Sequence, residues 1–282
     1  MHKQPLISLV IPAKNSGKYL EQCLRAIRKQ TYKNVEILII DSNSTDNTAQ
    51  IAKTYKAKVV PFSIKLQKGK FDAPFKRNFG VEKAKGKYVY YYDADMEMPP
   101  KLLEEIVYLF SVKKFDALVV SEDSVGTGIW ARAKQLERRC YWGDDTVEAA
   151  RVFVKRVWNE LGGLDLSIGG GGDDWDMHHR LLVGGYKIRR TKNKVKHHEG
   201  NLQLLQLMKK RFMYGRDSIK YLVKSPQASF ISYFPIRPAF IRNWRLFLAS
   251  PLVSFAFVVM RTGEYLAGFL GIVYSQFEYE KK

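Results

Sequence analysis

The sequence predicts an α/β fold in which a mostly parallel sheet is flanked by helices. Short apolar runs of strand length alternate with segments of helical periodicity over residues 7–92, as in successive βαβ units. The last of these strands, at residues 88–92, consists of Tyr and Val and leads directly into Asp93 and Asp95. Because ligands bind at the carboxyl ends of strands in such sheets, the two carboxylates predict a binding site.

The first half of the chain supplies the predicted strands and helices in alternation. Helices are expected at residues 18–30, where Leu20, Leu24 and Ile27 share one face, and after the cap-type residues 44–48. A third helix is expected at residues 75–85. Apolar and β-branched runs predict strands at residues 7–12, 35–40, 57–62 and 88–92.

The second half continues the alternation. A helix is expected at residues 99–110, with Pro99 and Pro100 at its start. A strand at 116–121, a helix at 129–142 and a strand at 152–154 follow. After a glycine run at 169–172, three acids are expected on a loop at the same sheet edge as Asp41, Asp93 and Asp95. These acids are Asp173, Asp174 and Asp176.

The last part of the chain is apolar, and the chain is predicted to divide into a catalytic domain at 1–225 and membrane-associating helices at 226–282. A spanning helix needs roughly 20 apolar residues, and Pro251 and Arg261 interrupt the apolar runs at 246–260 and 265–274. Two short helices in the membrane interface, or a re-entrant hairpin, are therefore expected. A single tilted span and a pair of buried helices are the alternatives.

Positive charge is concentrated in one region. The formal net charge is +19, and residues 180–245 hold 16 basic and two acidic residues. Such a one-sided distribution implies a polyanionic partner, either nucleic acid or an anionic membrane surface. Trp244 and the arginines around it favour the membrane interface. These arginines are Arg237, Arg242 and Arg245.

Several classes of protein are excluded or disfavoured because the sequence lacks their characteristic motifs. The two cysteines, Cys23 and Cys140, form no disulfide framework, which favours a reducing compartment. Residues 6–11 have the length of a strand rather than of a signal-peptide core, so no signal peptide is expected. No GxGxxG, GxxxxGK[ST], HExxH or GxSxG motif is present, which argues against dinucleotide oxidoreductases, P-loop NTPases and other motif-defined enzymes.

The order and spacing of several short motifs resemble the family-2 glycosyltransferases, which are inverting enzymes of GT-A fold. The resemblance extends over roughly residues 5–220. Within the family, the membrane-associated members that use lipid-linked sugars are the most similar. The matching segments are residues 8–15, 36–48, 77–80, 86–95, 169–176 and 209–216.

The resemblance implies a role for each matching residue. Asp174 would be the catalytic base. Asp95 would bind a divalent metal, Mg²⁺ or Mn²⁺, on the donor diphosphate, with one of His197 and His198 as a further ligand and His198 favoured. The donor-binding residues would be Pro12, Ala13, Asn15, Asp41, Arg77 and Asp93.

The sequence departs from the family pattern at three places. Asp173 stands where the family has Glu before the base, and Ser42 stands where a second acid usually follows Asp41. No QxxRW motif occurs near residue 216, so processive polymer synthesis is not expected. A basic helix is expected in its place, where it could contact acceptor phosphate or anionic headgroups. Its basic residues are Lys209, Lys210, Arg211 and Arg216.

The function that follows is a metal-dependent hexosyltransferase acting at the cytoplasmic face of the cell membrane, as a peripheral or monotopic protein. Its donor would be GDP-mannose, with UDP-glucose as the next choice, and its acceptor a lipid-linked molecule such as a polyprenyl phosphate. A hydroxyl acceptor would need Asp174 as base, whereas a phosphate acceptor would need none.

Two other classes stay open. A nucleic-acid-binding protein would explain the charge, but no recognisable binding module with interleaved aromatic residues is present. An NDP-sugar nucleotidyltransferase would also use a Rossmann-like sheet and paired acids. It should carry a glycine-rich loop after the first strand, where this chain has Pro12, Ala13, Lys14 and Asn15.

Overall fold

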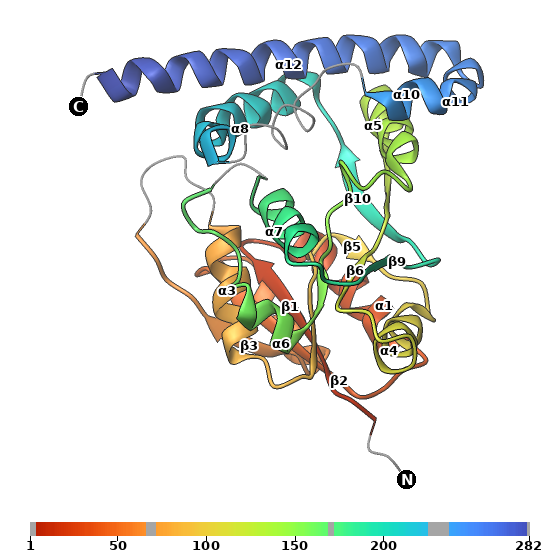
Figure 1. Cartoon of the computed structure of the whole chain (residues 1–282), viewed down its shortest axis with the longest axis vertical. Coiled ribbons are helices and arrows are strands. Elements are labelled where there is room, and N and C mark those ends of the chain that lie inside the picture. Colours follow the sequence, from red (N-terminus) through yellow and green to blue (C-terminus); the bar gives the residue numbers. More distant parts are fainter. Residues whose placement is uncertain (1–3, 66–71, 169–171, 225–236, 281–282) are drawn as a thin grey trace.

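The computed structural model describes residues 4–65, 72–168, 172–224 and 237–280. At its centre is a seven-stranded sheet with the order β3-β2-β1-β4-β8-β6-β9 (Figure 1). Among these strands β8 alone runs antiparallel to both of its neighbours, β4 and β6. The mostly parallel α/β sheet is therefore confirmed. The strands are β1 (Ile7–Ala13), β2 (Val35–Asp41), β3 (Lys58–Pro61), β4 (Tyr88–Tyr91), β6 (Ala117–Val119), β8 (Val152–Val154) and β9 (Ile188–Arg190).

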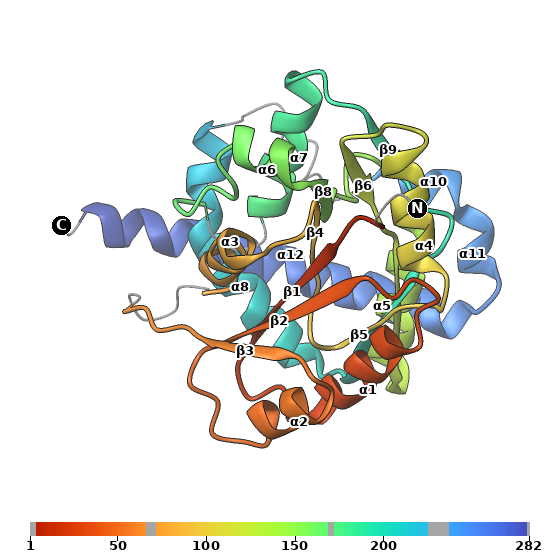
Figure 2. The same ribbon diagram turned by 90° about the horizontal axis from the view of Figure 1, so that it is seen from below.

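Helices cover both faces of this sheet (Figure 2). One face packs against α1 (Gly17–Arg28), α2 (Thr48–Thr54) and α4 (Leu102–Ser111). The other packs against α3 (Ala73–Lys83), α6 (Lys155–Glu160) and α7 (Gly172–Val183). The helix expected from residue 99 thus begins at Leu102. Burial of apolar area on two faces explains why the central strands read as continuous apolar runs.

The tyrosine-rich strand belongs to both cores. Side chains alternate between the two faces of a strand, so Tyr88 and Tyr90 pack with α1 and α4, together with Tyr92 just beyond the strand. Val89 and Tyr91 pack on the opposite face. All five side chains are buried. The tract therefore anchors the two acids that follow it to the most buried part of the sheet.

A second, three-stranded sheet has the order β5-β10-β7. Its strands are β5 (Met96–Glu97), β7 (Glu122–Thr127) and β10 (Val195–Asn201). None of them is predicted from the sequence. They are short or polar, and they pair residues from distant parts of the chain, so local periodicity gives no signal for them.

The acids after the glycine run lie on a helix rather than on a loop. Asp173 and Asp174 occupy the first turn of α7, and Asp176 follows them. Asp176 is buried and pairs with Arg180, one turn later, at 2.8 Å. It therefore does not contribute to the sheet edge as expected. Residues 169–171 of the glycine run lie outside the described residues.

The C-terminal elements form a layer across one end of the molecule, with α12 running along its outside (Figure 1). The layer consists of α5 (Gly128–Tyr141), α8 (Leu204–Lys224), α10 (Pro238–Arg242), α11 (Trp244–Leu248) and α12 (Pro251–Glu280). A third apolar cluster joins them, built from Ala133, Leu207, Ala256, Phe257 and Met260. The domain boundary expected at 225/226 lies outside the described residues.

The expectation of two short helices over residues 246–274 is wrong, because α12 continues unbroken through Arg261. The Arg261 guanidinium is buried and pairs with Glu137 of α5 at 2.8 Å and with Glu264 at 3.0 Å. One partner on α5 and one within α12 thus compensate the charge that interrupts the apolar pattern. Within α12, Pro251–Gln276 is long and apolar enough to span a membrane by length and composition alone, with a mean hydropathy of 1.4.

Helices α8 and α12 touch backbone to backbone. A Cβ atom on Gly215 would lie 2.0 Å from the Gly268 carbonyl oxygen, and one on Gly271 would lie 2.1 Å from the Phe212 carbonyl oxygen. Any larger residue at Gly215 or Gly271 would force the helices apart. Helix α12 is therefore held on the protein by close packing as well as by ion pairs.

Candidate active site

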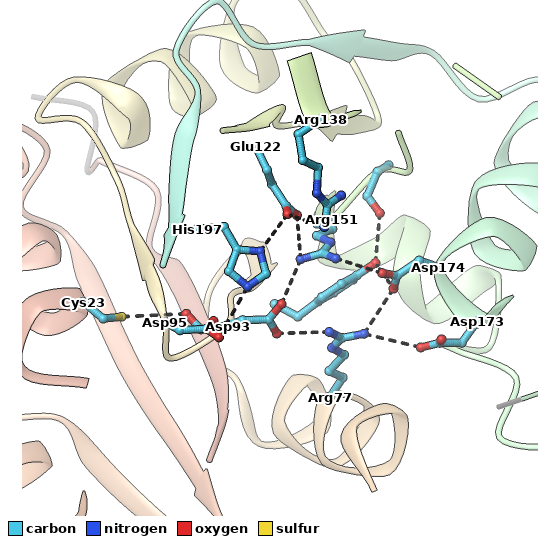
Figure 3. Close-up of polar contacts among 12 residues, drawn as sticks. Cys23, Arg77, Asp93, Asp95, Glu122, Arg138, Arg151, Asp173, Asp174 and His197 are labelled. Carbon is cyan, nitrogen blue, oxygen red and sulfur yellow. Dashed lines mark hydrogen bonds and ion pairs between the residues drawn. The ribbon is translucent and has the colours of Figure 1, made fainter. Parts of the chain in front are cut away.

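A network of charged side chains lies at the carboxyl end of β4 (Figure 3). Asp93 and Asp95 follow this strand, and Arg77 reaches them from α3. Arg151 stands directly before β8, Glu122 begins β7, and His197 lies on β10. The second sheet therefore completes a site that the first sheet begins. Asp173 and Asp174 enter from the start of α7.

Two arginines join the acids to one another. Arg77 contacts Asp93 Oδ1 at 3.1 Å, Asp174 Oδ1 at 3.2 Å and Asp173 Oδ2 at 3.4 Å. Arg151 contacts Asp93 Oδ2 at 3.0 Å and Asp174 Oδ2 at 3.2 Å. Each oxygen of Asp93 and of Asp174 thus faces a different guanidinium. The two arginines hold these carboxylates in fixed positions.

Tyr91 lies between the arginines. Its ring centroid is 4.8 Å from the Arg77 guanidinium carbon and 6.0 Å from that of Arg151. Its hydroxyl lies 2.9 Å from Asp174 Oδ1 and 3.0 Å from the Ala150 carbonyl oxygen, and it can donate to one of them at a time. The aromatic face and the hydroxyl therefore both support the same charged network.

His197, not His198, lies beside Asp95. Its Nε2 is 3.4 Å from Asp95 Oδ2, and its Nδ1 is 3.0 Å from Glu122 Oε2. His198 instead contacts Glu97 at 3.1 Å and stacks on Tyr19. Neighbouring residues of a strand point to opposite faces, so one of the two histidines had to face away. The structure therefore places His197, and not the favoured His198, beside Asp95, and the choice of metal ligand between them stays a prediction.

The pKa values of the buried groups follow from these contacts. Burial lowers the pKa of His197, but the hydrogen bonds that its ring donates to Asp95 and Glu122 outweigh burial and raise the pKa to about 10. Burial raises the pKa of Asp93, but Arg77 and Arg151 outweigh it and lower the pKa to about 2. For Glu122, Arg151 and Arg138 overcome burial and hold the pKa well below its ordinary value. Asp93 and Glu122 are therefore anionic at neutral pH.

Asp173 behaves differently from these acids. Burial and the neighbouring charge of Asp174 raise the pKa of Asp173 to about 7, although Arg77 opposes them. Two adjacent carboxylates cannot both ionise easily. At neutral pH the Asp173–Asp174 pair therefore binds a proton for part of the time.

The residues expected to contact the donor lie around the ends of β1 and β2. Pro12 and Ala13 are in β1, and Asn15, at φ 51°, accepts a hydrogen bond from the Thr45 amide at 2.8 Å. Asp41 ends β2 and accepts a hydrogen bond from the Ser44 amide at 3.2 Å. The structure brings Arg77 and Asp93 together, but it places these four residues at the neighbouring strand ends.

Ser42 has a carboxylate beside it after all. Its hydroxyl donates to Asp72 Oδ2 at 3.0 Å, and Asp72 also pairs with Lys76 at 3.1 Å. Asp72 precedes α3 and is 30 residues from Ser42 in the chain. An acid directly before α3 thus stands close to the place where the family carries a second acid after β2.

The basic residues expected to contact acceptor or membrane are divided among several environments. Lys209 and Lys210 are exposed, and Arg211 lies 3.6 Å from Glu264. Arg216 is half-buried in α8. Arg242 and Arg245 are exposed, and Arg242 lies 3.8 Å from Asp144. Arg237 is buried over the Tyr141 ring, so it does not lie at a membrane-facing surface.

Sequence reasoning missed Glu122, Arg138 and Arg151. Arg138 lies on α5, 3.3 Å from Glu122, and Arg151 lies 3.1 Å from the other oxygen of Glu122. None of the three belongs to a recognisable motif. A buried charge is costly unless paired, but this rule identifies such residues only when burial is known. Among the described residues, no group of three or more His, Cys, Asp and Glu side chains is arranged to hold a metal ion.

The sequence is similar to those of known glycosyltransferases. The sequence model described as Glycosyl transferase family 2 matches residues 8–165. Glycosyltransferase GlyG of Streptococcus pneumoniae is 34% identical over 114 residues, which are 40% of this chain and 38% of that protein. The uncharacterized glycosyltransferase YibD of Escherichia coli is 37% identical over 107 residues, 38% of this chain and 31% of that protein. The matches thus span 38% and 31% of these two relatives.

Solved structures show the same fold. Mannosyltransferase PcManGT from Pyrobaculum calidifontis, in complex with GDP-Man and Mn²⁺, gives a TM-score of 0.66 at 15% identity, over 96% of this chain and 88% of that chain. TarS from S. aureus, in complex with UDP-GlcNAc, gives a TM-score of 0.56 at 13% identity, over 93% and 90% of the two chains. The GT-A-like architecture expected from the sequence is confirmed.

Replacing Arg151 by Met should lower the free energy of unfolding by about 3–5 kcal/mol, because one buried and two largely buried carboxylates lose one of their counterions. The matched control is Arg139→Met. Arg139 forms an exposed pair with Asp123 at 2.9 Å, and its loss should cost less than about 1 kcal/mol. Urea unfolding of the three proteins measures the difference. Equal losses in the two variants would contradict the structural role given to Arg151.

Asp173→Asn should change the pH dependence of stability. The folded pKa of Asp173 is about 7, above its ordinary value of 3.8. The folded protein therefore retains a proton that the unfolded chain releases, and stability decreases as pH rises from about 4 to about 7. Relative to wild type, the Asn variant should become more stable over this range, by at most about 4 kcal/mol. Melting curves measured at several pH values test this, and a constant difference would refute it.

Proposed function

The chain belongs to glycosyl transferase family 2, and on that premise we propose a metal-dependent, inverting transfer of a hexose from a nucleotide sugar to a lipid-linked acceptor. The observation that carries the proposal is the joint placement of Arg77, Asp93, Arg151 and Asp174 at the carboxyl end of β4. Two fixed guanidiniums suit the diphosphate of a nucleotide sugar. A carboxylate between them suits the reacting end of an acceptor.

GDP-mannose is the proposed donor, with UDP-glucose next. The similarity to a mannosyltransferase solved with GDP-Man and Mn²⁺ supports the first choice. TarS, which has the same fold, was solved with UDP-GlcNAc, so the fold itself accepts different nucleotides. The residues at the ends of β1 and β2, Asn15 and Asp41 among them, are the proposed contacts of the base and ribose.

Asp95 and His197 are the proposed protein ligands of Mg²⁺ or Mn²⁺. The Asp95 carboxylate is accessible, and Glu122 holds His197 so that Nε2 points toward Asp95. The carboxylate oxygen suits both Mg²⁺ and Mn²⁺. His197, whose pKa is raised to about 10, would release a proton on binding the metal. A site that shares its metal with substrate phosphates needs only one or two protein ligands. When bound, the metal ion supplies positive charge that stabilises the departing nucleoside diphosphate.

Asp174 is the proposed base for a hydroxyl acceptor. Both of its oxygens contact guanidiniums, and Tyr91 adds a hydroxyl to one of them. Donor phosphates compete for Arg77 and Arg151, so donor binding would weaken the hold of the arginines on Asp174. The carboxylate could then accept the proton of the acceptor hydroxyl. A phosphate acceptor would leave Asp174 with a positioning role only.

The proposed location is the cytoplasmic face of the cell membrane, with α10–α12 lying flat on it. Arg261 and Glu264 are buried near the middle of α12. Both pair with α5, Arg261 with Glu137 at 2.8 Å and Glu264 with Lys134 at 3.5 Å. A spanning orientation would break these pairs and move the charges into hydrocarbon. The outward face carries many exposed apolar side chains, including Trp244, Leu248, Leu252, Phe255, Val258, Leu266, Phe269, Leu270 and Tyr274. Such a face suits the membrane interface.

Nucleotide sugars should raise the melting temperature in the presence of Mn²⁺, because a ligand that binds only the folded state stabilises it. GDP-mannose should give the largest shift in a screen that includes UDP-glucose and UDP-GlcNAc. His197→Ala should abolish the part of the shift that depends on Mn²⁺, whereas the neighbouring variant His198→Ala should retain it. The proposal fails if no nucleotide sugar shifts the melting temperature with either metal.

Asp174→Asn should retain the donor-induced shift but slow transfer to a hydroxyl acceptor by about 10²–10⁴-fold, the usual contribution of a general base. Radiolabelled transfer to membrane lipid extracts measures the rate. An unchanged rate would contradict the role of Asp174 as base and would assign the acceptor nucleophile to a phosphate.

Replacing Phe255 and Phe269 together by Glu should weaken binding to vesicles that contain anionic lipid by about tenfold or more, because two apolar side chains lose their place in the interface. The control is the double variant Tyr108→Glu and Val112→Glu, which changes exposed apolar residues near the C-terminal end of α4. Co-sedimentation with vesicles measures binding. The same affinity in both double variants would argue against α12 as the membrane-binding surface.

A further inference from the structure

A hollow lies outside the charged network, along α1. Its volume is about 650 Å³, within the usual range for ligand sites. One wall is α1, and the other consists of β5, the residues after it, and the segment leading into β10. We call it the α1 groove. The lining residues are Lys18, Glu21, Gln22, Arg25, Ala26, Lys29, Glu97, Met98, Pro99, Pro100, Lys194 and Lys196.

The α1 groove is elongated. Lys18, Gln22, Arg25 and Lys29 follow one another at intervals of three or four residues, so they share one face of the helix. At a rise of 1.5 Å per residue, Lys18 and Lys29 are about 16 Å apart along the axis. A groove of this length fits a chain of several linked units better than a single small molecule.

Both walls of the α1 groove are positively charged. Five of its lining residues are cations, and they come from α1 and from the segment around β10. The two acids in the lining already have partners. Glu21 pairs with Arg25 at 2.9 Å, and Glu97 accepts hydrogen bonds from Gln22 at 2.7 Å and from His198. Glu97 also lies 3.7 Å from Lys196, so the two acids offset two of the five cations and leave three uncompensated.

Three cations of the α1 groove have no carboxylate partner within the described part of the chain. These are Lys18, Lys29 and Lys194, and all three are exposed. Lys194 lies over the Trp142 ring at 4.6 Å, which holds it near the groove. Uncompensated cations on two facing walls attract an anionic chain lying between them.

The floor of the α1 groove distinguishes between kinds of polyanion. It contains apolar side chains, those of Ala26, Met98, Pro99 and Pro100. The described lining includes no aromatic ring, whereas proteins that bind single-stranded nucleic acid use aromatic side chains on which the bases stack. The apolar floor and cationic walls suit a polymer with a neutral backbone and acidic substituents.

The α1 groove and the charged network share a wall. Glu97 of β5 lines the groove and is two residues from Asp95. On β10, His197 faces the network while its neighbour His198 holds Glu97 on the groove side. A chain in the groove would therefore lie directly behind the proposed metal site.

We propose that the α1 groove binds an acidic glycan, a linear saccharide carrying carboxylate or phosphate groups. The choice of a glycan among polyanions rests on the proposed glycosyltransferase function, because an enzyme of this kind meets saccharides as acceptors or products. The α1 groove would hold the glycan by its acidic groups. The transferase site would act on another part of the same glycan.

The test is direct binding of labelled polymers, measured by fluorescence anisotropy at low salt. The probes are oligogalacturonate, which carries carboxylates, phosphorylated dextran, which carries phosphates, and neutral dextran. An oligodeoxythymidylate of similar charge represents nucleic acid. Wild-type protein should bind one or both acidic glycans, should not bind neutral dextran, and should bind the oligonucleotide more weakly.

The groove variant combines Lys18→Gln, Lys29→Gln and Lys194→Gln. Its control combines Lys53→Gln, Lys58→Gln and Lys85→Gln, which remove the same charge from exposed positions outside the groove. The groove variant should bind acidic glycan about tenfold more weakly, as expected for three lost surface contacts. The control should bind within about twofold of wild type.

Equal affinity of the two variants, or tighter binding of the oligonucleotide than of either acidic glycan, would overturn the proposal. Whether carboxylate or phosphate is preferred follows from the two acidic probes. Melting shifts with GDP-mannose and Mn²⁺ are measured on the same variants and should not change. A missing donor shift with intact glycan binding would refute the proposed function alone, and the reverse result would refute the groove alone.

Discussion

The pairing of Arg77 and Arg151 with Asp93 and Asp174 is the interaction on which the site depends. Each of these side chains is largely buried, and each would be costly without its partners. The four residues come from α3, the end of β4, the start of β8 and α7. Because the pairs must form together, they fix these elements relative to one another. They also fix Glu122 through Arg151, and His197 through Glu122.

The sequence predicts the parts of the protein that are locally encoded. The central strands are apolar runs, and their order along the chain predicts the sheet and its ligand-binding edge. Asp93, Asp95 and Arg77 follow from their motifs, and the structure gathers them at that edge. The side on which His198 lies could not be predicted, because the register of β10 depends on its pairing with β5 and β7. A shift by one residue exchanges the two faces of a strand.

Residues that act through distant partners gave no local signal. Arg151 and Glu122 are separated from Asp93 and His197 along the chain, and nothing in the surrounding sequence marks them as buried. Arg261 led to a wrong prediction, because a charged residue within an apolar run suggests that a helix ends there. Its partner Glu137 lies on α5, and knowledge of that contact was needed to see that α12 continues. The common cause is that burial and pairing of charges are properties of the folded chain.

The close approach of α12 to α8 has a consequence for acceptor choice. Backbone contact at Gly215 and Gly271 leaves α12 no room to slide or tilt on the protein. Helix α8 follows β10, which carries His197, and α5 follows β7, which begins with Glu122. On the proposed membrane, the reacting centre would therefore sit at a constant height above the lipid surface. The protein would then act as a ruler that selects acceptors by the length of the spacer between lipid anchor and reactive group.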